Sequence, residues 1–99
     1  MDIVFDLSRC IVGTSFEDLS PNTVDVTKRF ILDTLGVGIA GSTAAGAKEA
    51  AEQMVEWGGM PESTIMCFGK KVPSLNAAFA NSVMIHARDF DDAHDGAVV

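Results

Sequence analysis

The stretch from Leu75 to about Arg88 constrains the fold most. It follows Pro73 and Ser74, which together form a helix start signal, and its apolar side chains cover nearly every face of the predicted helix. Such a helix is stable only when other elements cover it on most sides. We therefore expect a mainly α fold in which this helix is buried nearly all round.

An acidic cluster follows that helix directly. Four aspartates and a histidine fall within seven residues, at Asp89, Asp91, Asp92, His94 and Asp95. The C-terminal end of a helix already presents about half a negative charge, and a carboxylate placed there costs roughly 0.3–1 kcal/mol. Two interpretations stay open at this point. Asp89 acts as a base or hydrogen-bond acceptor at the edge of a pocket, or the cluster is a solvated acidic loop.

Apolar spacing in the rest of the chain predicts three further helices and one short strand or hairpin. The expected helices run from about Asp2 to Val12, Pro21 to Gly41 and Thr43 to Trp57, and the hairpin lies near residues 63–72. Ser20 before Pro21 marks a helix start, because serine accepts a hydrogen bond from the first turn and proline needs no N–H there. The helix from Pro21 has two apolar faces, so it should be a central helix buried on two sides.

Smaller features complete this prediction of about four helices. Ala50, Met54 and Trp57 are the expected buried stripe of the third helix. Gly69, Lys70 and Lys71 should form the turn after the strand, with both lysines in solvent rather than at an anion site.

The segment Gly36–Gly41 matches the G-x-G-x-x-G pattern of dinucleotide-binding loops. That loop needs a strand immediately before it and a helix that opens at the glycines. Here the preceding residues have helical spacing instead. We therefore interpret the glycines as small residues inside a helix, with Gly36 and Ala40 on one face, where another helix can approach closely.

Charge and composition exclude several classes of partner. Asp and Glu number 14 against 7 for Lys and Arg, and the net charge of −7 argues against nucleic acid or an anionic membrane surface. The longest apolar run, Leu35–Ala40, is far shorter than the roughly 20 residues of a membrane-spanning helix. Cys10 and Cys67 form no C-x-x-C, which favours neither a zinc motif nor a disulfide framework. We expect a soluble, cytoplasmic protein.

Two other candidate sites carry less support. Ser82 and His86 are four residues apart, so a hydroxyl–imidazole pair is possible, but a core histidine with satisfied hydrogen bonds is the favoured interpretation. A calcium loop counted from Asp91 fails, because its third position is Ala93. A looser metal site built from Asp91, Asp92 and His94 stays open as an alternative.

Two segments resemble the motifs of the MmgE/PrpD family. They are Phe30–Ser42, with the sequence FILDTLGVGIAGS, and His86–Asp92, with the sequence HARDFDD, to which Asn81 is added. The resemblance covers nearly the whole chain in order. The family includes 2-methylcitrate dehydratase, cis-aconitate decarboxylase and an iminodisuccinate epimerase.

The resemblance implies chemistry on small polycarboxylates without a metal or organic cofactor. It places Asp89, the first aspartate of D-F-D-D, in the active site, and we take Asp89, Asp92 and His94 as candidate catalytic residues. The family often has threonine after the motif, where this chain has Ala93, and that polar contact is missing here. The family's catalytic histidine follows several residues later, so His94 lies closer to the motif than that histidine does.

The resemblance also implies a large helical domain, a smaller α/β domain and, usually, a homodimer. Family members are several times longer than the 99 residues of this chain. We therefore expect residues 1–99 to be a single unit, the incomplete amino-terminal part of the helical domain, which exposes apolar surface, self-associates and is inactive alone. The expected function is that of a lyase that dehydrates or decarboxylates a small tricarboxylate. The alternative is a non-catalytic acidic helical interaction module.

Removal of divalent cations should leave the thermal stability of this protein unchanged, because the sequence offers no complete ligand set. The measurement is the melting temperature with and without EDTA. A clear drop in EDTA that one divalent cation reverses would contradict the expectation.

Overall fold

A computed structural model describes residues 2–90 of the chain, and within that range the fold is mainly α, as predicted. It contains four α-helices, a short 3-10 helix and one two-stranded sheet. In chain order these are α1 (Ile3–Gly13), η1 (Phe16–Asp18), α2 (Pro21–Gly41), α3 (Ala47–Trp57), β1 (Ser63–Ile65), β2 (Lys70–Val72) and α4 (Ser74–His86).

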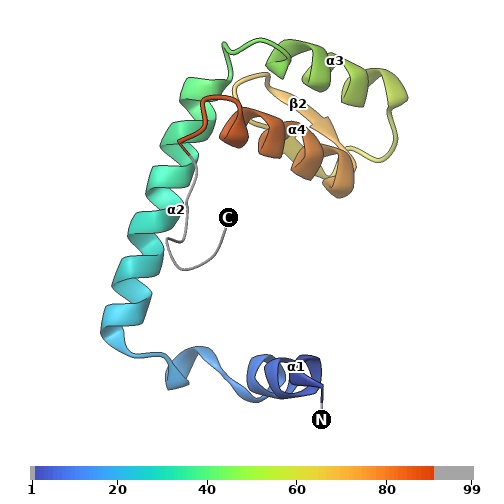
Figure 1. The fold of residues 1–99 in the computed structure, drawn as a ribbon. Coiled ribbons are helices and arrows are strands. Elements are labelled where there is room, and N and C mark those ends of the chain that lie inside the picture. Colours follow the sequence, from blue (N-terminus) through green and yellow to red (C-terminus); the bar gives the residue numbers. More distant parts are fainter. Residues whose placement is uncertain (1, 91–99) are drawn as a thin grey trace.

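The long helix α2 is a stem that joins two separate parts of the molecule (Figure 1). Its C-terminal end meets a head made of α3, the hairpin and α4, while α1 lies beyond its other end. The radius of gyration is 16.6 Å. A compact domain of this length would have about 13 Å. The chain is therefore elongated, and its packed core lies in the head.

The core forms where α3 and α4 pack against each other and against the antiparallel hairpin. Ser63 pairs with Val72 and Ile65 with Lys70, which turns Ile65 and Val72 toward the helices. All eight buried apolar residues belong to the head: Ala47, Ala51, Met54, Ile65, Val72, Ala77, Ala80 and Met84. Alanine at four of these positions lets the two helices lie close together.

Helix α4 is covered on only one side, so the prediction that it is buried nearly all round is wrong for this range of residues. Ala77, Ala80 and Met84 are buried, whereas the side chain of Leu75 is 80% exposed and that of Phe79 is 54% exposed.

Trp57 was expected in the buried stripe of α3 and is 69% exposed. Met54 is buried as predicted, and Ala47 and Ala51 complete the stripe in place of Ala50 and Trp57.

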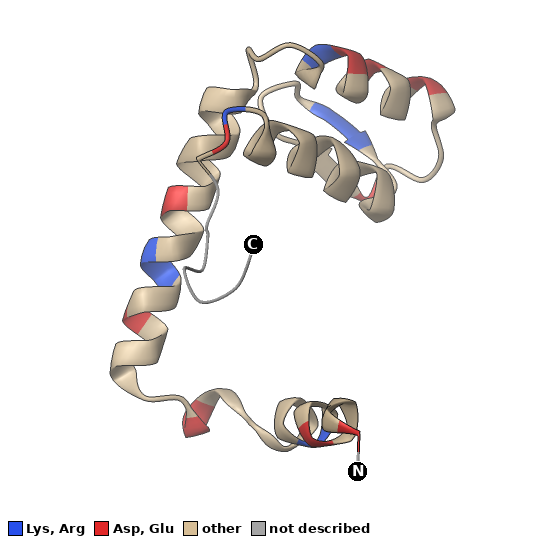
Figure 2. Cartoon of the chain, viewed as in Figure 1, with Lys and Arg blue, Asp and Glu red and all other residues tan. Residues whose placement is uncertain are grey.

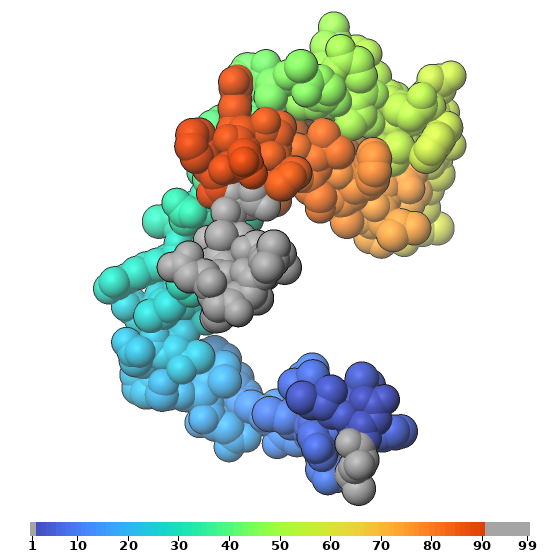
Figure 3. Space-filling model, viewed as in Figure 1, coloured from blue at the N-terminus to red at the C-terminus, as the bar shows by residue number. Residues whose placement is uncertain are grey.

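Helix α2 is also less covered than its two apolar faces predict. Only Gly38 and Gly41 are buried in it, both near its C-terminal end. Its earlier apolar side chains, such as Phe30 and Ile31, are each 55% exposed. Helix α1 has no buried residue. Figure 3 shows α1 and the head at opposite ends of the molecule, so α1 gains no cover from the head.

The glycine pattern lies wholly inside α2, which confirms the helical interpretation and leaves no strand–loop–helix for a dinucleotide. The expected packing of this segment against another helix is confirmed, and it occurs at Gly38 and Gly41 rather than at Gly36. A Cβ at Gly38 would lie 2.8 Å from Met66 Cε and 3.1 Å from Ile85 Cγ1. A Cβ at Gly41 would overlap the backbone carbonyl of Met84, whereas one at Gly36 would meet nothing within 4 Å.

Other boundaries differ from the predictions by a few residues. Helix α3 begins at Ala47 rather than Thr43, because Gly46 before it has a positive φ of 88°. The hairpin turn lies at residues 66–69, where Cys67 and Gly69 have φ values of 67° and 62°, so Lys70 and Lys71 belong to β2 and are exposed. No helix in the described range is long and apolar enough to cross a membrane.

The glycine contact predicts how substitutions at three glycines change the free energy of unfolding. Gly41→Ala and Gly38→Leu should each lower the free energy of unfolding by about 1–3 kcal/mol, because the added atoms overpack the contact with α4. Gly36→Ala is the matched control and should raise it by about 0.5–1 kcal/mol, since alanine favours a helix and meets no neighbour there. Urea denaturation followed by circular dichroism measures all three. Equal effects at Gly36 and Gly41 would contradict the observed packing.

Candidate functional site

Asp89 lies just beyond α4, in a turn. Its φ of 56° is in the left-handed region, and its amide donates a hydrogen bond to the His86 carbonyl at 2.9 Å. Helices often end with one left-handed residue, usually glycine and sometimes asparagine. Aspartate at this position is exposed, so its carboxylate projects from a fixed point at the end of a packed helix.

Arg88 connects this turn to the end of α2. Its Nη2 donates to Thr43 Oγ1 at 3.1 Å, and its Nε makes a longer, weaker contact with the carbonyl of Ala40 at 3.4 Å. The Ala40 carbonyl is one of the last in α2, where the helix presents partial negative charge. The Arg88 side chain thus caps the C-terminal end of a helix other than its own.

Asn81 fixes α4 to the hairpin through both ends of its amide. Its Nδ2 donates to the Thr64 carbonyl at 3.1 Å, and its Oδ1 accepts from the Met66 amide at 2.9 Å. These bonds satisfy backbone groups at the end of β1 and at the start of the turn, next to the Gly38 contact. In the described geometry Asn81 positions the hairpin rather than reaching toward Asp89.

Two other predicted residues lie on the surface of α4. His86 and Ser82 are both exposed, so the prediction of a core histidine is wrong. His86 is the last residue of α4, a position where a basic side chain interacts favourably with the helix end.

The remaining predicted site residues, Asp92 and His94, lie outside the described residues, as do Asp91, Ala93 and Asp95. Their catalytic roles, and the looser metal site, therefore stay predictions. Within residues 2–90, no cluster of three or more His, Cys, Asp or Glu side chains is placed to hold a metal ion.

Charged side chains avoid α4 and gather at its end. Figure 2 shows α4 without a charged residue along its length, with Arg88 and Asp89 directly after it. Elsewhere the ion pairs are exposed and local, such as Arg29–Asp25 at 2.8 Å and Lys48–Glu52 at 3.6 Å. Exposed pairs of this kind contribute little to stability. Arg88, by contrast, contacts residues 45 and 48 positions earlier in the chain.

One carboxyl, that of Asp18, has a shifted pKa, and it lies far along the chain from Arg88 and Asp89. The backbone N–H of Ser15 and then its hydroxyl donate to the Asp18 carboxylate, at 2.8 and 3.0 Å, and they lower the pKa of Asp18. Asp18 belongs to η1, before α2, so it has no part in the candidate site.

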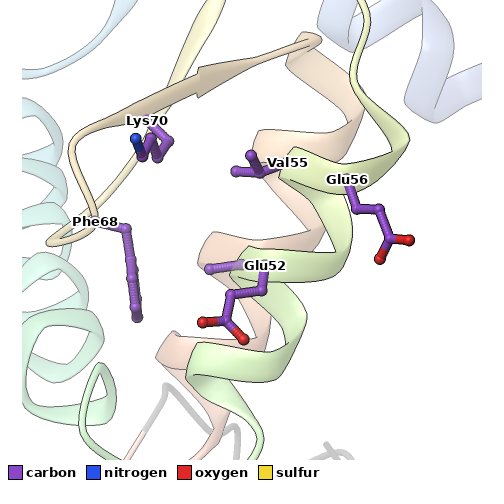
Figure 4. A pocket seen from close by; sticks show the side chains of 6 residues that line it. Glu52, Val55, Glu56, Phe68 and Lys70 are labelled. Atoms are coloured by element: carbon purple, nitrogen blue, oxygen red, sulfur yellow. The ribbon is translucent and has the colours of Figure 1, made fainter.

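The surface depressions near the site are shallow and lack a cluster of basic side chains. One groove along α2 ends at Phe90, the neighbour of Asp89, and its charged lining residue is Asp33. A second cleft lies between α3 and the hairpin, where Glu52, Glu56 and Lys70 surround Phe68 and Val55 (Figure 4). Its lining carries more negative than positive charge. Neither depression suits a polycarboxylate by itself.

A third groove lies between α3 and α4 and has a volume of about 690 Å³. Its lining includes Trp57, Leu75 and Phe79 and no charged residue. This groove is an apolar surface without a group that could perform acid–base chemistry.

The sequence did not predict the contact between Arg88 and Thr43 or the two hydrogen bonds of Asn81. A basic residue at the end of α4 suggests helix capping, but nothing local shows that Arg88 caps α2 instead, since its partners are 45 and 48 residues away. Asn81 stood out only through the family resemblance.

Asn81→Ala should destabilise the head by about 1–3 kcal/mol, because it leaves a part-buried amide and a carbonyl without their hydrogen bonds. Amide hydrogen exchange should show faster exchange at Met66. The control is Ser82→Ala, an exposed neighbour on α4, which should change stability by less than about 0.5 kcal/mol. Unchanged Met66 exchange in the Asn81 variant would show that this amide is held by other contacts.

Comparison with known proteins agrees with the motifs. Residues 6–99 match the model of the MmgE/PrpD N-terminal domain. The chain is 33% identical to cis-aconitate decarboxylase of Homo sapiens over 93 residues, which cover 91% of this chain and 19% of that protein. It is 32% identical to cis-aconitate decarboxylase of Mus musculus over 85 residues, which cover 83% and 17%. The chain thus spans less than a fifth of the length of these relatives, and no solved structure gives a significant match. The chain belongs to the MmgE/PrpD family.

Proposed function

We propose that this chain contributes the base of a lyase that removes water or carbon dioxide from a small polycarboxylate. The observation that carries the proposal is the placement of Asp89, an exposed carboxylate in a left-handed turn at the end of a packed helix. Membership of the family and the similarity to two decarboxylases support the same reaction class.

The proposed role follows from what each reaction requires. Dehydration removes a proton from the carbon next to a carboxylate, breaks the C–O bond at the neighbouring carbon, and releases the hydroxyl as water after it receives a proton. In decarboxylation a C–C bond breaks, carbon dioxide leaves, and the remaining carbon takes up a proton. Asp89 would accept the proton in the first reaction or, in its protonated form, donate it in the second. Asp92 and His94 are proposed as the other participants.

Both reactions build negative charge on the substrate, which cationic groups must stabilise. Arg88 is the basic side chain beside Asp89, but two of its nitrogen atoms contact oxygen atoms at the end of α2. The groove that ends at Phe90 has no basic lining residue. We therefore propose that the cations come from other parts of a longer protein or from a second copy in a homo-oligomer.

A second candidate function is a helical interaction module without catalytic activity. The observation in its favour is the uncharged groove between α3 and α4, together with the exposed apolar residues of α1. Large exposed apolar patches commonly mark interaction sites. An activity screen of the full reading frame with cis-aconitate, methylcitrate and citrate distinguishes the two functions.

In that full reading frame, Asp89→Asn should lower turnover by about 10²-fold or more, because the amide keeps the shape of the side chain but cannot act as a base. The melting temperature should change little, since the side chain is exposed. Steady-state kinetics with the best substrate of the screen measures the effect.

The matched control is Asp6→Asn, which removes an equally exposed carboxylate from α1 and should leave turnover unchanged. Wild-type turnover in the Asp89 variant would show that this aspartate is only a solvated helix end. A wild-type protein without activity on any of the three acids would favour the interaction module.

A further inference from the structure

The turn that presents Asp89 needs support from outside itself. Its backbone is left-handed at a residue other than glycine, a conformation that L-amino acids adopt at an energetic cost. Within the described residues, the Asp89 amide donates to the His86 carbonyl. Helix ends tend to fray. Contacts with another element would help to hold Asp89 in one orientation.

Arg88 supplies those contacts from the neighbouring position. Its guanidinium contacts two segments of the chain. It reaches the last turn of α2 through the Ala40 carbonyl and the loop after α2 through the Thr43 hydroxyl oxygen. The planar group offers several N–H donors in a rigid fork, so contacts with two acceptors fix its direction better than contact with one. Once the Arg88 side chain is fixed on α2, the backbone of the next residue is fixed with it.

The end of α2 is itself a firm support. A Cβ at Gly41 would overlap the Met84 carbonyl, so α2 and α4 touch backbone to backbone within a few residues of Arg88. Ser42 adds a cap to the same helix end, because its hydroxyl donates to the Ile39 carbonyl at 2.6 Å. Arg88 therefore holds onto a part of the molecule that cannot move independently of α4.

We infer that Arg88 is a positioning residue for Asp89 and that Thr43 is its partner. The hydrogen bond between Arg88 and Thr43 sets the direction of the Asp89 carboxylate, and neither residue binds substrate. The inference rests on the proposed function in one respect, since it takes Asp89 as the group that moves the proton. A misplacement of about 1 Å at such a group can cost up to about 10²-fold in rate.

The test is a double-mutant cycle in the full reading frame with Arg88→Gln, Thr43→Val and both together. Each single variant should lower kcat by about 10-fold while KM stays within about twofold, because the base is misdirected but substrate contacts remain. The double variant should be no slower than Arg88→Gln alone, since both changes remove the same interaction. Thr43→Ser keeps the hydroxyl and should retain wild-type kcat.

Arg29→Gln is the matched control. This arginine is exposed on α2 and pairs with Asp25, so its loss should leave kcat and KM unchanged. If Arg88→Gln raises KM while Thr43→Val has no effect, Arg88 contacts the substrate and the inference is wrong. It is equally wrong if both variants lower the melting temperature but keep wild-type kcat, which is the result of a purely structural link.

Hydrogen exchange separates this inference from the proposed function. Exchange of the Asp89 amide should speed up by about 10-fold in both Arg88→Gln and Thr43→Val, and not in Arg29→Gln, because the turn opens more often. This measurement needs no substrate. If the wild-type protein lacks lyase activity but the exchange responds as expected, the proposed function fails and the positioning role stands. Unchanged exchange at Asp89 in an active enzyme overturns the positioning role alone.

Discussion

The backbone contact between α2 and α4 at Gly41 determines the geometry of the head. Because Gly41 has no side chain, α2 can lie against the Met84 carbonyl, and Gly38 leaves room for Met66 and Ile85 in the same way. This close approach brings the end of α2 within reach of Arg88, which lies just beyond α4. Gly38 lies against Met66 of the hairpin turn, whose amide donates to Asn81 Oδ1. The position of Asp89 thus depends on glycines about 50 residues earlier in the chain.

Apolar side chains are distributed very unevenly over the molecule. The head buries eight apolar residues, of which only Ile65, Val72 and Met84 are both large and fully buried. In contrast, Ile3, Phe5 and Leu7 of α1 are 69, 64 and 57% exposed, and Phe30 and Ile31 of α2 are each 55% exposed. A helix with an apolar face gains most of its stability from packing that face against a partner. Within residues 2–90, α1 has no buried residue, so its apolar face lacks that packing there.

Local signals in the sequence predicted most of the elements, and long-range contacts account for most of the errors. Ser20 and Pro21 start α2 as predicted, and the Ser20 side chain accepts from the Thr23 amide at 3.1 Å. The four helices and the hairpin were likewise recognisable from spacing. Trp57 was misplaced because periodicity shows that a face is apolar but not whether a neighbour covers it. The contact of Gly41 with the Met84 carbonyl was missed for a related reason, since the residues that touch are chosen by the angle at which two helices cross. Of the three candidate catalytic residues Asp89, Asp92 and His94, only Asp89 lies within the described range.

The electrostatics of this junction explain how a carboxylate can be placed where helices end. The C-terminal ends of α2 and α4 meet there, and each presents partial negative charge that disfavours a nearby aspartate. Arg88 brings a positive charge to the same place, and its nitrogen atoms contact oxygens at the end of α2. A tight ion pair with Asp89 would offset the same repulsion, but it would also occupy the carboxylate oxygens that a base needs. Because Arg88 is directed toward α2, the repulsion is reduced while the Asp89 carboxylate stays exposed. The arrangement therefore combines a turn next to a helix-capping arginine with an exposed carboxylate.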